Sequence, residues 1–407
     1  GLARPEGVES LIAAGRDAGA LDATKREALL RAYRTIDPGW RKLNDAVQAH
    51  LAQAPKPKTE KMLISSEGVP AVRLHTQGDD FLKETHFLKR GDPGLKDGVA
   101  APGFLQVLMN TPAAEKRWQA APPPGWRTSY RRRALAGWIT DTEAGAGHLL
   151  ARVIVNRLWQ HHMGRGIVAT PSDFGAQGEK PTHPELLDWL ARELIRNGWR
   201  LKPIHRLMMT SAVYLQSSRV EPAKAKADPA NKLFGRHPRR RLEAEVIRDS
   251  MLAVSGLLDR NQFGPGTLDE SHKRRSIYFT VKRSKLVPVL QIFDAPDALQ
   301  GMAVRSTTTV APQALLLLNN SNVRDYARSF AKRIAPKPDT PHDEAVRAGY
   351  VTALGRQPTA AELADTTAFL QAQVAASRAA GAANAEEQAL ADFCQVLMGL
   401  NEFVYID

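Results

Sequence analysis

The sequence predicts a mainly α-helical protein with a small, irregular β-containing insert near its N-terminal third. Apolar residues recur at helical spacing over most of the 407 residues. Glycine and proline stand between these periodic stretches, where helices end. One stretch, 58–129, loses the helical period and is richer in glycine and proline. We therefore expect a helical connector at 1–57, the insert at 58–129, a helical core at 130–335 and a C-terminal helical subdomain at 336–407.

The connector and the insert have different local patterns. Apolar residues of Leu21–Gln53 repeat at helical spacing, with a break at Asp37-Pro38 because the residue before a proline disfavours the α conformation. In the insert, Ala71–His75 and His86–Leu88 have the composition of short extended pieces. The triple proline at 122–124 is the expected end of the insert.

The first helices of the core have clear ends in the sequence. The apolar stripe Leu150, Ile154, Leu158 is followed by Gly164, a typical C-terminal cap. Thr182-His183-Pro184-Glu185 matches a capping box and predicts the start of a second helix, which Gly198 ends. A third helix is expected from Pro203 to Ser211.

Four further elements are expected after residue 239. Arg240–Leu258 has an amphipathic helical pattern, with Arg239/Glu243 and Arg241/Glu245 at the spacing of stabilising ion pairs. Ser276–Val281 is the best strand candidate of this half. Ala311–Asn319 and Val323–Ile334 are predicted as a helical pair. Thr359–Glu362 is a second capping box, and it predicts the first of two C-terminal helices.

The charge is strongly positive and unevenly placed. The net charge is +13, but His342–Asp407 carries three basic and nine acidic residues, so the rest of the chain carries +19. Such a field attracts polyanions. The densest basic clusters are the candidate polyanion-binding residues Arg131, Arg132 and Arg133, then Arg239, Arg240 and Arg241, then Lys273, Arg274 and Arg275, with Lys282, Arg283 and Lys285 nearby. An ordinary basic surface is the alternative explanation.

Several common functional motifs are absent from the sequence. It has no phosphate-binding loop, no dinucleotide-binding glycine motif, no His-Glu-x-x-His and no Gly-x-Ser-x-Gly. The single cysteine, Cys394, cannot form the two-cysteine haem attachment motif, and its apolar neighbours predict a buried side chain. We therefore expect no cofactor and no metal in this chain. The longest aliphatic run, Ala314–Leu318, is too short for a membrane span.

The polar side chains that could form a site are concentrated between residues 156 and 216. Imidazole and carboxylate groups are suitable metal ligands or acid–base catalysts, but the histidines lack the i,i+3 or i,i+4 spacing of a metal-binding helix. Structural hydrogen bonding is therefore the leading interpretation, with metal binding and His/Asp catalysis as alternatives. The candidate binding residues are Asn156, Arg157, Gln160, His161, His162, Arg165, Asp173, His183 and His205.

Arg305 is a further candidate binding residue. It precedes three threonines and Pro312, a pattern typical of an extended segment that enters a helix, with Thr309 or Val310 at the N-cap. An arginine beside hydroxyl groups could also bind an anion. Capping is the leading interpretation of this segment.

Long strings of this sequence resemble a known domain family. They are Arg131–Ile139, Ala151–His162, Pro171–Gly175, His183–Leu190, Arg240–Glu245, Thr309–Leu315 and Leu400–Tyr405. From about Tyr130 onward the chain is similar to the planctomycete cytochrome-associated domain of unknown function, the PSD-type C-terminal domain of multidomain cytochrome c proteins. The residues before Tyr130 resemble its upstream connector.

The resemblance implies a periplasmic or extracellular setting, although no signal peptide is found between Gly1 and Asp407. It also implies a cytochrome c-like domain, in the same chain or a partner chain, as the place of any c-type haem. The leading function is an accessory binding or scaffolding module of such a protein. The alternatives are an enzyme that acts on anionic polysaccharide with a His/Asp site, and a non-specific nucleic-acid binder. Among partners, the cytochrome c-like domain comes first and anionic polysaccharide is the second candidate. Nucleic acid is expected least, because few aromatic residues accompany the basic clusters.

Overall fold

The computed structural model describes residues 23–55, 85–126, 128–299 and 301–406. By the contacts between residues, the chain divides into two compact units, Gly1–Met62 and Leu63–Asp407. Helices dominate the described residues of both units, and the sheets found there have two short strands each, so the predicted mainly α fold class is confirmed. The expected extended piece Ala71–His75 lies outside the described residues.

The described part of the first unit is a pair of helices, α2 (Ala23–Ile36) and α3 (Pro38–Ala52). The helix break predicted at Asp37-Pro38 is confirmed. Asp37 adopts an extended conformation and its carboxylate accepts a hydrogen bond from the Trp40 backbone N–H at 2.6 Å. The residue that cannot continue α2 thus caps α3.

The described part of the second unit begins at Thr85, within the expected insert. Its short antiparallel strands β1 (His86–Leu88) and β2 (Lys96–Val99) confirm the expected β content at His86–Leu88. Farther along, Trp118 and Trp138 pack with Phe104 in a small apolar cluster beneath α4 (Arg131–Thr140). The insert is therefore held to the first helix of the core by aromatic packing.

A second apolar cluster joins three helices of the core. These are α5 (Gly147–Met163), α6 (Pro184–Arg196) and α7 (Leu201–Met209), and the short α8 (Pro222–Ala227) follows them. Val155, Trp159 and Met163 form the buried face of α5, and Gly164 ends that helix with a φ of 73°. A left-handed backbone favours glycine, so the predicted C-cap is confirmed.

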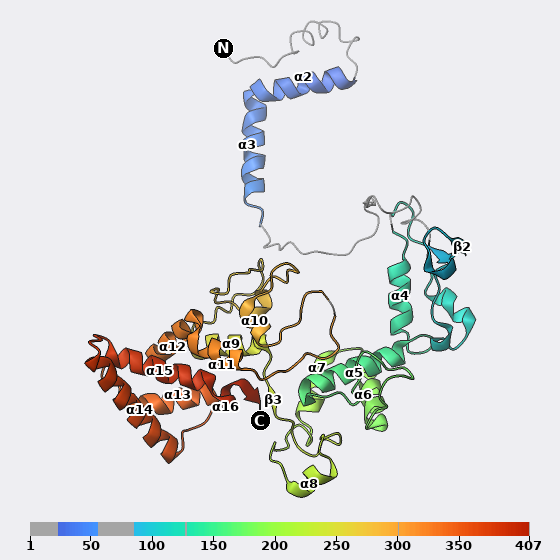
Figure 1. Ribbon diagram of the computed structural model, residues 1–407. Coiled ribbons are helices and arrows are strands. Elements are labelled where there is room, and N and C mark those ends of the chain that lie inside the picture. The colour runs from blue at the N-terminus through green and yellow to red at the C-terminus, as the bar shows by residue number, and fades with distance from the viewer. Residues whose placement is uncertain (1–22, 56–84, 127, 300, 407) are drawn as a thin grey trace. The chain divides into compact units, whose positions relative to one another are not determined.

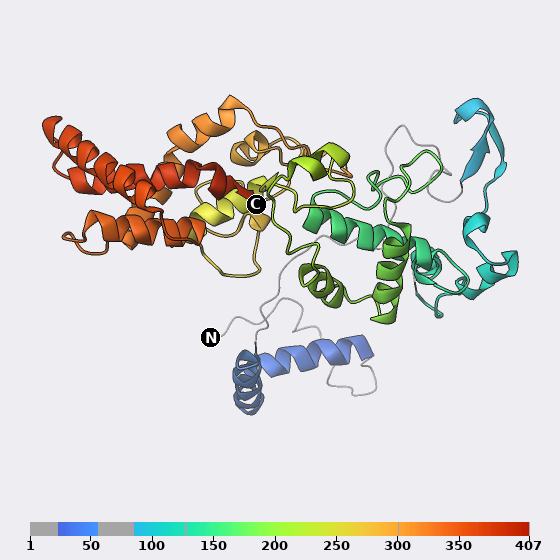
Figure 2. The same cartoon turned by 90° about the horizontal axis from the view of Figure 1, so that it is seen from below.

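The largest apolar cluster combines the remaining α-helices. They are α9 (Ala244–Val254), α10 (Pro288–Ile292), α11 (Ala311–Asn319), α12 (Ser321–Ile334), α13 (His342–Leu354), α14 (Ala360–Ala379), α15 (Ala385–Gly399) and α16 (Asn401–Val404). Figures 1 and 2 show α15 between α12 and α14, and it packs against both. Cys394 of α15 is fully buried in this cluster, as predicted. The capping box of Thr359 and Glu362 is confirmed at the start of α14.

Three local predictions are wrong. The strand expected at Ser276–Val281 is a short 3-10 helix, Ser276–Tyr278, because Arg248 and Asp249 bind this segment through their side chains. The capping box at Thr182 does not form: His183 is the N-cap of α6, and the Thr182 hydroxyl bonds the His183 ring instead.

The third wrong prediction concerns the helix expected from Arg240. Residues Arg240–Arg241 form strand β3, which pairs antiparallel with β4 (Tyr405–Ile406), and α9 begins four residues later than expected. An i,i+4 ion pair requires both residues to lie on one helix, and Arg241 in β3 does not share a helix with Glu245 in α9. Arg241 instead pairs with Asp294, and Glu245 pairs with Arg305.

Candidate functional site

The exposed side of the last turns of α5 carries three polar side chains that face one region. Because Val155, Trp159 and Met163 are buried, the intervening positions Arg157 and His161 remain exposed. Gln160 lies beside them and donates a hydrogen bond to the Ala303 carbonyl at 3.4 Å. This bond connects α5 with a segment 143 residues later in the chain.

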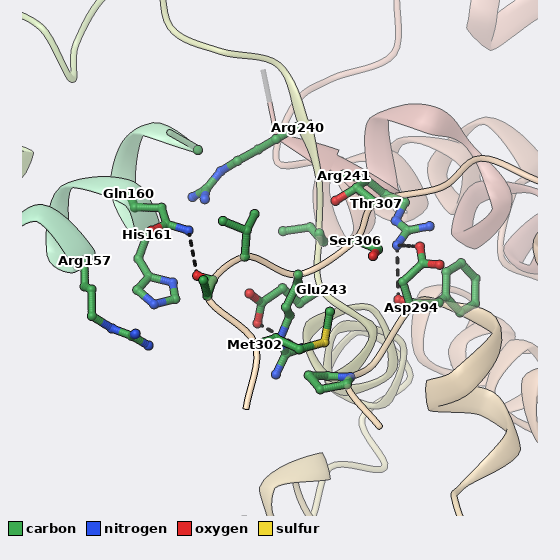
Figure 3. A pocket seen from close by; sticks show the side chains of 17 residues that line it. Arg157, Gln160, His161, Arg240, Arg241, Glu243, Asp294, Met302, Ser306 and Thr307 are labelled. Carbon is green, nitrogen blue, oxygen red and sulfur yellow. Dashed lines mark hydrogen bonds and ion pairs between the residues drawn. The ribbon is translucent and has the colours of Figure 1, made fainter. Parts of the chain in front are cut away.

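Strand β3 supplies two arginines that point to opposite sides, as alternating positions of a strand do (Figure 3). Arg240 extends toward α5, where a Cβ added at Gly164 would lie 3.7 Å from its Cδ. Arg241 extends the other way, and its side chain is only 4% exposed. Its guanidinium donates to the carboxylate of Asp294 at 2.7 Å, to the Thr308 carbonyl at 2.6 Å and to the Phe293 carbonyl at 3.1 Å.

Asp294 organises the far wall of the region. Its backbone is left-handed, with a φ of 62°, an uncommon conformation for a residue other than glycine. Its carboxylate accepts from the Thr308 backbone N–H and hydroxyl, both at 2.8 Å, and from Arg241. Burial alone would raise the pKa of Asp294, but these hydrogen bonds and the Arg241 charge lower it below its ordinary value. Asp294 is thus an ionised anchor for the strand and the threonine segment.

Arg305 is held by two carboxylates at the start of α9. It contacts both oxygens of Glu245, at 2.6 and 3.0 Å, and Glu243 at 3.3 Å. The hydrogen bonds from Arg305 outweigh burial and lower the pKa of Glu245, and the same contacts raise the pKa of Arg305. This fork-to-fork pair fixes the segment that follows residue 301 against α9.

These elements enclose a pocket of about 400 Å³, shown in Figure 3. Helix α5, strand β3, the turn at Asp294 and the segment from Met302 to Thr307 form its walls. The lining residues are Arg157, Gln160, His161, Gly164, Arg240, Arg241, Leu242, Glu243, Phe293, Asp294, Pro296, Met302, Ala303, Val304, Arg305, Ser306 and Thr307. We call this the arginine pocket. Four of the sequence-predicted candidates, Arg157, Gln160, His161 and Arg305, therefore lie together, with Arg240 and Arg241 of the basic clusters.

The charges of the arginine pocket are only partly balanced. Asp294 neutralises Arg241, and Glu243 and Glu245 neutralise Arg305. Arg157 and Arg240 form no ion pair with any of the described residues. The pocket therefore keeps an excess of positive charge on the side of α5.

Arg240 is the least satisfied of these cations. Burial lowers its pKa, although nearby Tyr214 and Glu243 partly offset this effect. Its Nε is buried and lacks a hydrogen-bond partner within the described part of the chain. A cation that is removed from water without a partner is costly, and an anion in the pocket would offset that cost.

The remaining candidates of the first half lie in local structure. Asn156 is fully buried and clamps Val168, donating to its carbonyl at 3.0 Å and accepting from its N–H at 2.8 Å. Asp173 accepts from the Gly175 N–H in a turn, and Arg165 pairs with Glu179 at 3.1 Å. Each of these contacts orders the loop between α5 and α6.

Of the four candidate histidines, His162 and His205 contact each other, and His161 and His183 lie apart from them. His162 Nε2 and His205 Nδ1 lie 2.8 Å apart, whereas His183 contacts Thr182 and Phe234. Burial, then the charges of His205 and Arg240, lowers the pKa of His162. In the described ranges, no group of three or more His, Cys, Asp or Glu side chains is placed to hold a metal ion.

The other basic clusters have varied surroundings. Arg131, Arg132 and Arg133 form the exposed first turn of α4. Lys273 lies over the ring of Tyr326, Arg274 stacks on Tyr278 at 3.6 Å, and Arg275 lies 3.4 Å from Asp249. Arg239 is exposed beside β3. These side chains are therefore not equivalent sources of free positive charge.

Sequence reasoning missed Asp294 and the residues around Met302 as parts of the site. No motif marks them, since their roles depend on contacts outside a local sequence window: Asp294 binds Thr308, 14 positions away, and Arg241, 53 positions away. The polar string before Pro312 was the one available signal, and it indicated the segment but not its partners.

Comparison with known proteins identifies the family. Residues 131–370 match the family PSD1, described as a protein of unknown function (DUF1553). The chain belongs to this family. The matched residues include every residue of the arginine pocket. No curated protein and no solved structure matches the chain. Among the described residues, no helix is long and apolar enough to cross a bilayer.

Proposed function

We propose that this DUF1553 chain is a binding module whose arginine pocket takes an acidic group of an anionic polysaccharide. The observation that carries the proposal is Arg240, a partly buried cation without an ion-pair partner among the described residues, which lines the pocket as the exposed Arg157 also does. Guanidinium groups without an ion-pair partner suit a carboxylate or sulfate, which accepts paired hydrogen bonds from arginine.

The rest of the pocket favours a sugar as the carrier of that acidic group. The pocket is also lined by one amide side chain, that of Gln160 on α5, and by two hydroxyl groups, those of Ser306 and Thr307. Such groups pair with sugar hydroxyls. Single-stranded nucleic acid is bound mainly on exposed aromatic side chains, whereas the pocket's one six-membered aromatic ring, Phe293, is 4% exposed.

The test is binding of polygalacturonate and dextran sulfate, with neutral dextran and single-stranded DNA as comparisons. Each polymer is titrated at low and at moderate salt, because binding through charge weakens as salt rises. We expect Arg240→Gln and Arg157→Gln each to weaken binding of the acidic polymers about tenfold, the loss of one charge-assisted hydrogen bond. Neutral dextran should not bind.

The matched control is Arg192→Gln, which removes an equal charge from the exposed face of α6, outside the arginine pocket. Its affinity should stay within about twofold of wild type. An equal loss in Arg192→Gln would mean that the binding depends on overall charge alone. Binding of DNA in preference to the acidic polysaccharides would contradict the choice of ligand.

We further propose that the module acts beside a cytochrome c-like domain, of the same or a partner chain, in an exported protein. The family resemblance supports this setting, and the single cysteine, Cys394, is buried in α15. Haem staining and cell fractionation of the protein from its native cells would test it. A haem-free assembly or a cytoplasmic location would contradict it.

A further inference from the structure

A second pocket, of about 670 Å³, lies between the insert and α4, in the same unit as the arginine pocket but with different chemistry. Its lining is mostly apolar and aromatic. The lining residues are Pro102, Gly103, Phe104, Leu105, Gln119, Ala120, Ser129, Tyr130, Arg131, Ala134, Leu135 and Trp138. We call this the aromatic pocket. None of these residues takes part in the proposed polysaccharide binding.

The floor of the aromatic pocket is rigid. The ring of Phe104 stacks on Trp138 with centroids 5.4 Å apart and meets Trp118 edge-on at 5.4 Å. Trp118 is fixed in turn, because its Nε1–H donates to the Asp141 carboxylate at 3.0 Å. Gly137 allows this packing, since a Cβ there would lie 3.1 Å from Trp118 Cδ1. A pocket on such a base is already formed before a ligand enters.

Two leucines at the rim of the aromatic pocket are exposed to solvent. Leu105 is 61% exposed and Leu135 is 50% exposed, although both line the pocket. Covering them would gain apolar burial that the chain itself does not provide. The volume fits a small molecule of one or two rings, since pockets for such ligands measure about 300–1,000 Å³.

The same rim carries positive charge. Arg131 lines the pocket at the first position of α4, and its guanidinium has no ion pair among the described residues. The first turn of α4 has no acidic residue, so the positive end of the helix dipole adds to this charge. No carboxylate is among the lining residues.

We propose that the aromatic pocket binds a small aromatic carboxylate, with the ring against Leu105, Leu135 and the Phe104–Trp138 stack. The carboxylate would face Arg131 at the rim. This assigns the chain a second ligand class, independent of the polysaccharide. An apolar floor and a single cationic edge together select a flat molecule with one acidic end.

The experiment measures binding of three probes to the full chain by calorimetry and by tryptophan fluorescence. The probes are 2-naphthoate, the neutral 2-naphthol, and acetate, which has the charge but no ring. We expect 2-naphthoate to bind at least about tenfold more tightly than 2-naphthol and acetate not to bind at millimolar concentration. Absence of 2-naphthoate binding would overturn the proposal, and so would equal binding of naphthoate and naphthol.

Variants separate the two parts of the pocket. Arg131→Gln should weaken 2-naphthoate about five- to tenfold and leave 2-naphthol unchanged, whereas Leu135→Gln should weaken both ligands. The matched control is Arg133→Gln: this arginine is on the same helical turn but stacks on the Tyr130 ring at 5.1 Å and does not line the pocket. An equal loss of 2-naphthoate affinity in the Arg131 and Arg133 variants would mean that only the overall positive charge attracts the ligand. That result would overturn the assignment of Arg131 as the carboxylate's partner.

The two proposals can fail separately. Arg240→Gln removes a cation from the arginine pocket and should leave 2-naphthoate affinity unchanged, and Leu135→Gln should leave polysaccharide affinity unchanged. All variants are compared by circular dichroism first, and Leu135 and Arg131 are exposed enough that their substitution should preserve the fold. A loss of naphthoate binding in Arg240→Gln would place the ligand in the arginine pocket and overturn this inference.

Discussion

Asn156 and Arg157 are adjacent candidates for which the structure predicts opposite effects of substitution. Asn156→Ala removes the side chain that pairs with both the N–H and the carbonyl of Val168, a residue 2% exposed. Each of the two buried backbone groups left unpaired costs about 1–3 kcal/mol, so the free energy of unfolding should fall by about 2–6 kcal/mol. In a unit of this size, that corresponds to a melting temperature roughly 3–8 °C lower.

Arg157→Gln should keep the stability of the protein and lose binding affinity. Its side chain is exposed at the rim of the arginine pocket and makes no ion pair in the described ranges, so the melting temperature should change by about 1 °C or less. Its affinity for acidic polysaccharide should fall, whereas Asn156→Ala should keep that affinity at temperatures below its melting transition. Thermal unfolding by circular dichroism and polymer titration measure the two effects.

Two results would refute this reasoning. An unchanged melting temperature in Asn156→Ala would mean that the Val168 clamp does not form. A polysaccharide affinity lost in folded Asn156→Ala, with Arg157→Gln unaffected, would reverse the assignment of the structural and the binding residue.

Three further predictions concern the core and its ion pairs. Asp294→Asn should lower the free energy of unfolding by about 3–5 kcal/mol in urea titration, because it leaves the buried Arg241 guanidinium without its counter-charge; an unchanged midpoint would contradict this. Hydrogen bonds from Arg356 lower the pKa of Glu362 from 4.5 to about 2, so its contribution is present above pH 4.5 and is lost as the pH falls toward 2. Glu362→Gln should therefore flatten the acid side of the stability profile, and an unaltered profile would argue against the pair. Burial raises the pKa of the Cys394 thiol, so a disulfide reagent should label it only after unfolding, and rapid labelling of the native protein would disprove that.

Much of the helical fold could be predicted because its signals are local. The break at Asp37-Pro38, the glycine cap at Gly164 and the capping box of Thr359 depend on a few neighbouring residues, and all three are found in the structure. Apolar periodicity located α11 and α12 for the same reason. These features require no knowledge of what packs against them.

The errors occur where a distant contact outweighs a local preference. Ser276–Val281 has strand composition, but the buried Arg248 donates to the carbonyl groups of Arg274 and Glu270 and to the Ser276 hydroxyl, and this fixes the segment in another shape. Arg241 has the helical spacing to pair with Glu245, but Asp294 provides a more buried partner. Neither competitor is visible in a sequence window of ordinary length.

The candidate site shows the same division. Arg157, Gln160 and His161 could be predicted as a group because one helix places them together. Their meeting with Arg240 and Arg305 could not, because it depends on β3 and on the segment held by Asp294. The sequence indicated the chemistry of the pocket, and long-range contacts determine its shape.

Those long-range contacts extend beyond the matched family segment, which ends at residue 370. Strand β3, which carries Arg240 and Arg241, pairs with β4, and the Leu242 N–H donates to the Val404 carbonyl at 2.7 Å. Phe403 and Val404 are themselves buried in the largest apolar cluster, together with most of α15. Without the segment after 370, β3 would lose its only pairing partner among the described strands, and Arg240 would lose its fixed direction. The arginine pocket therefore depends on residues after 370, outside the family match, as well as on α5 and β3, and the binding proposed for it should require them.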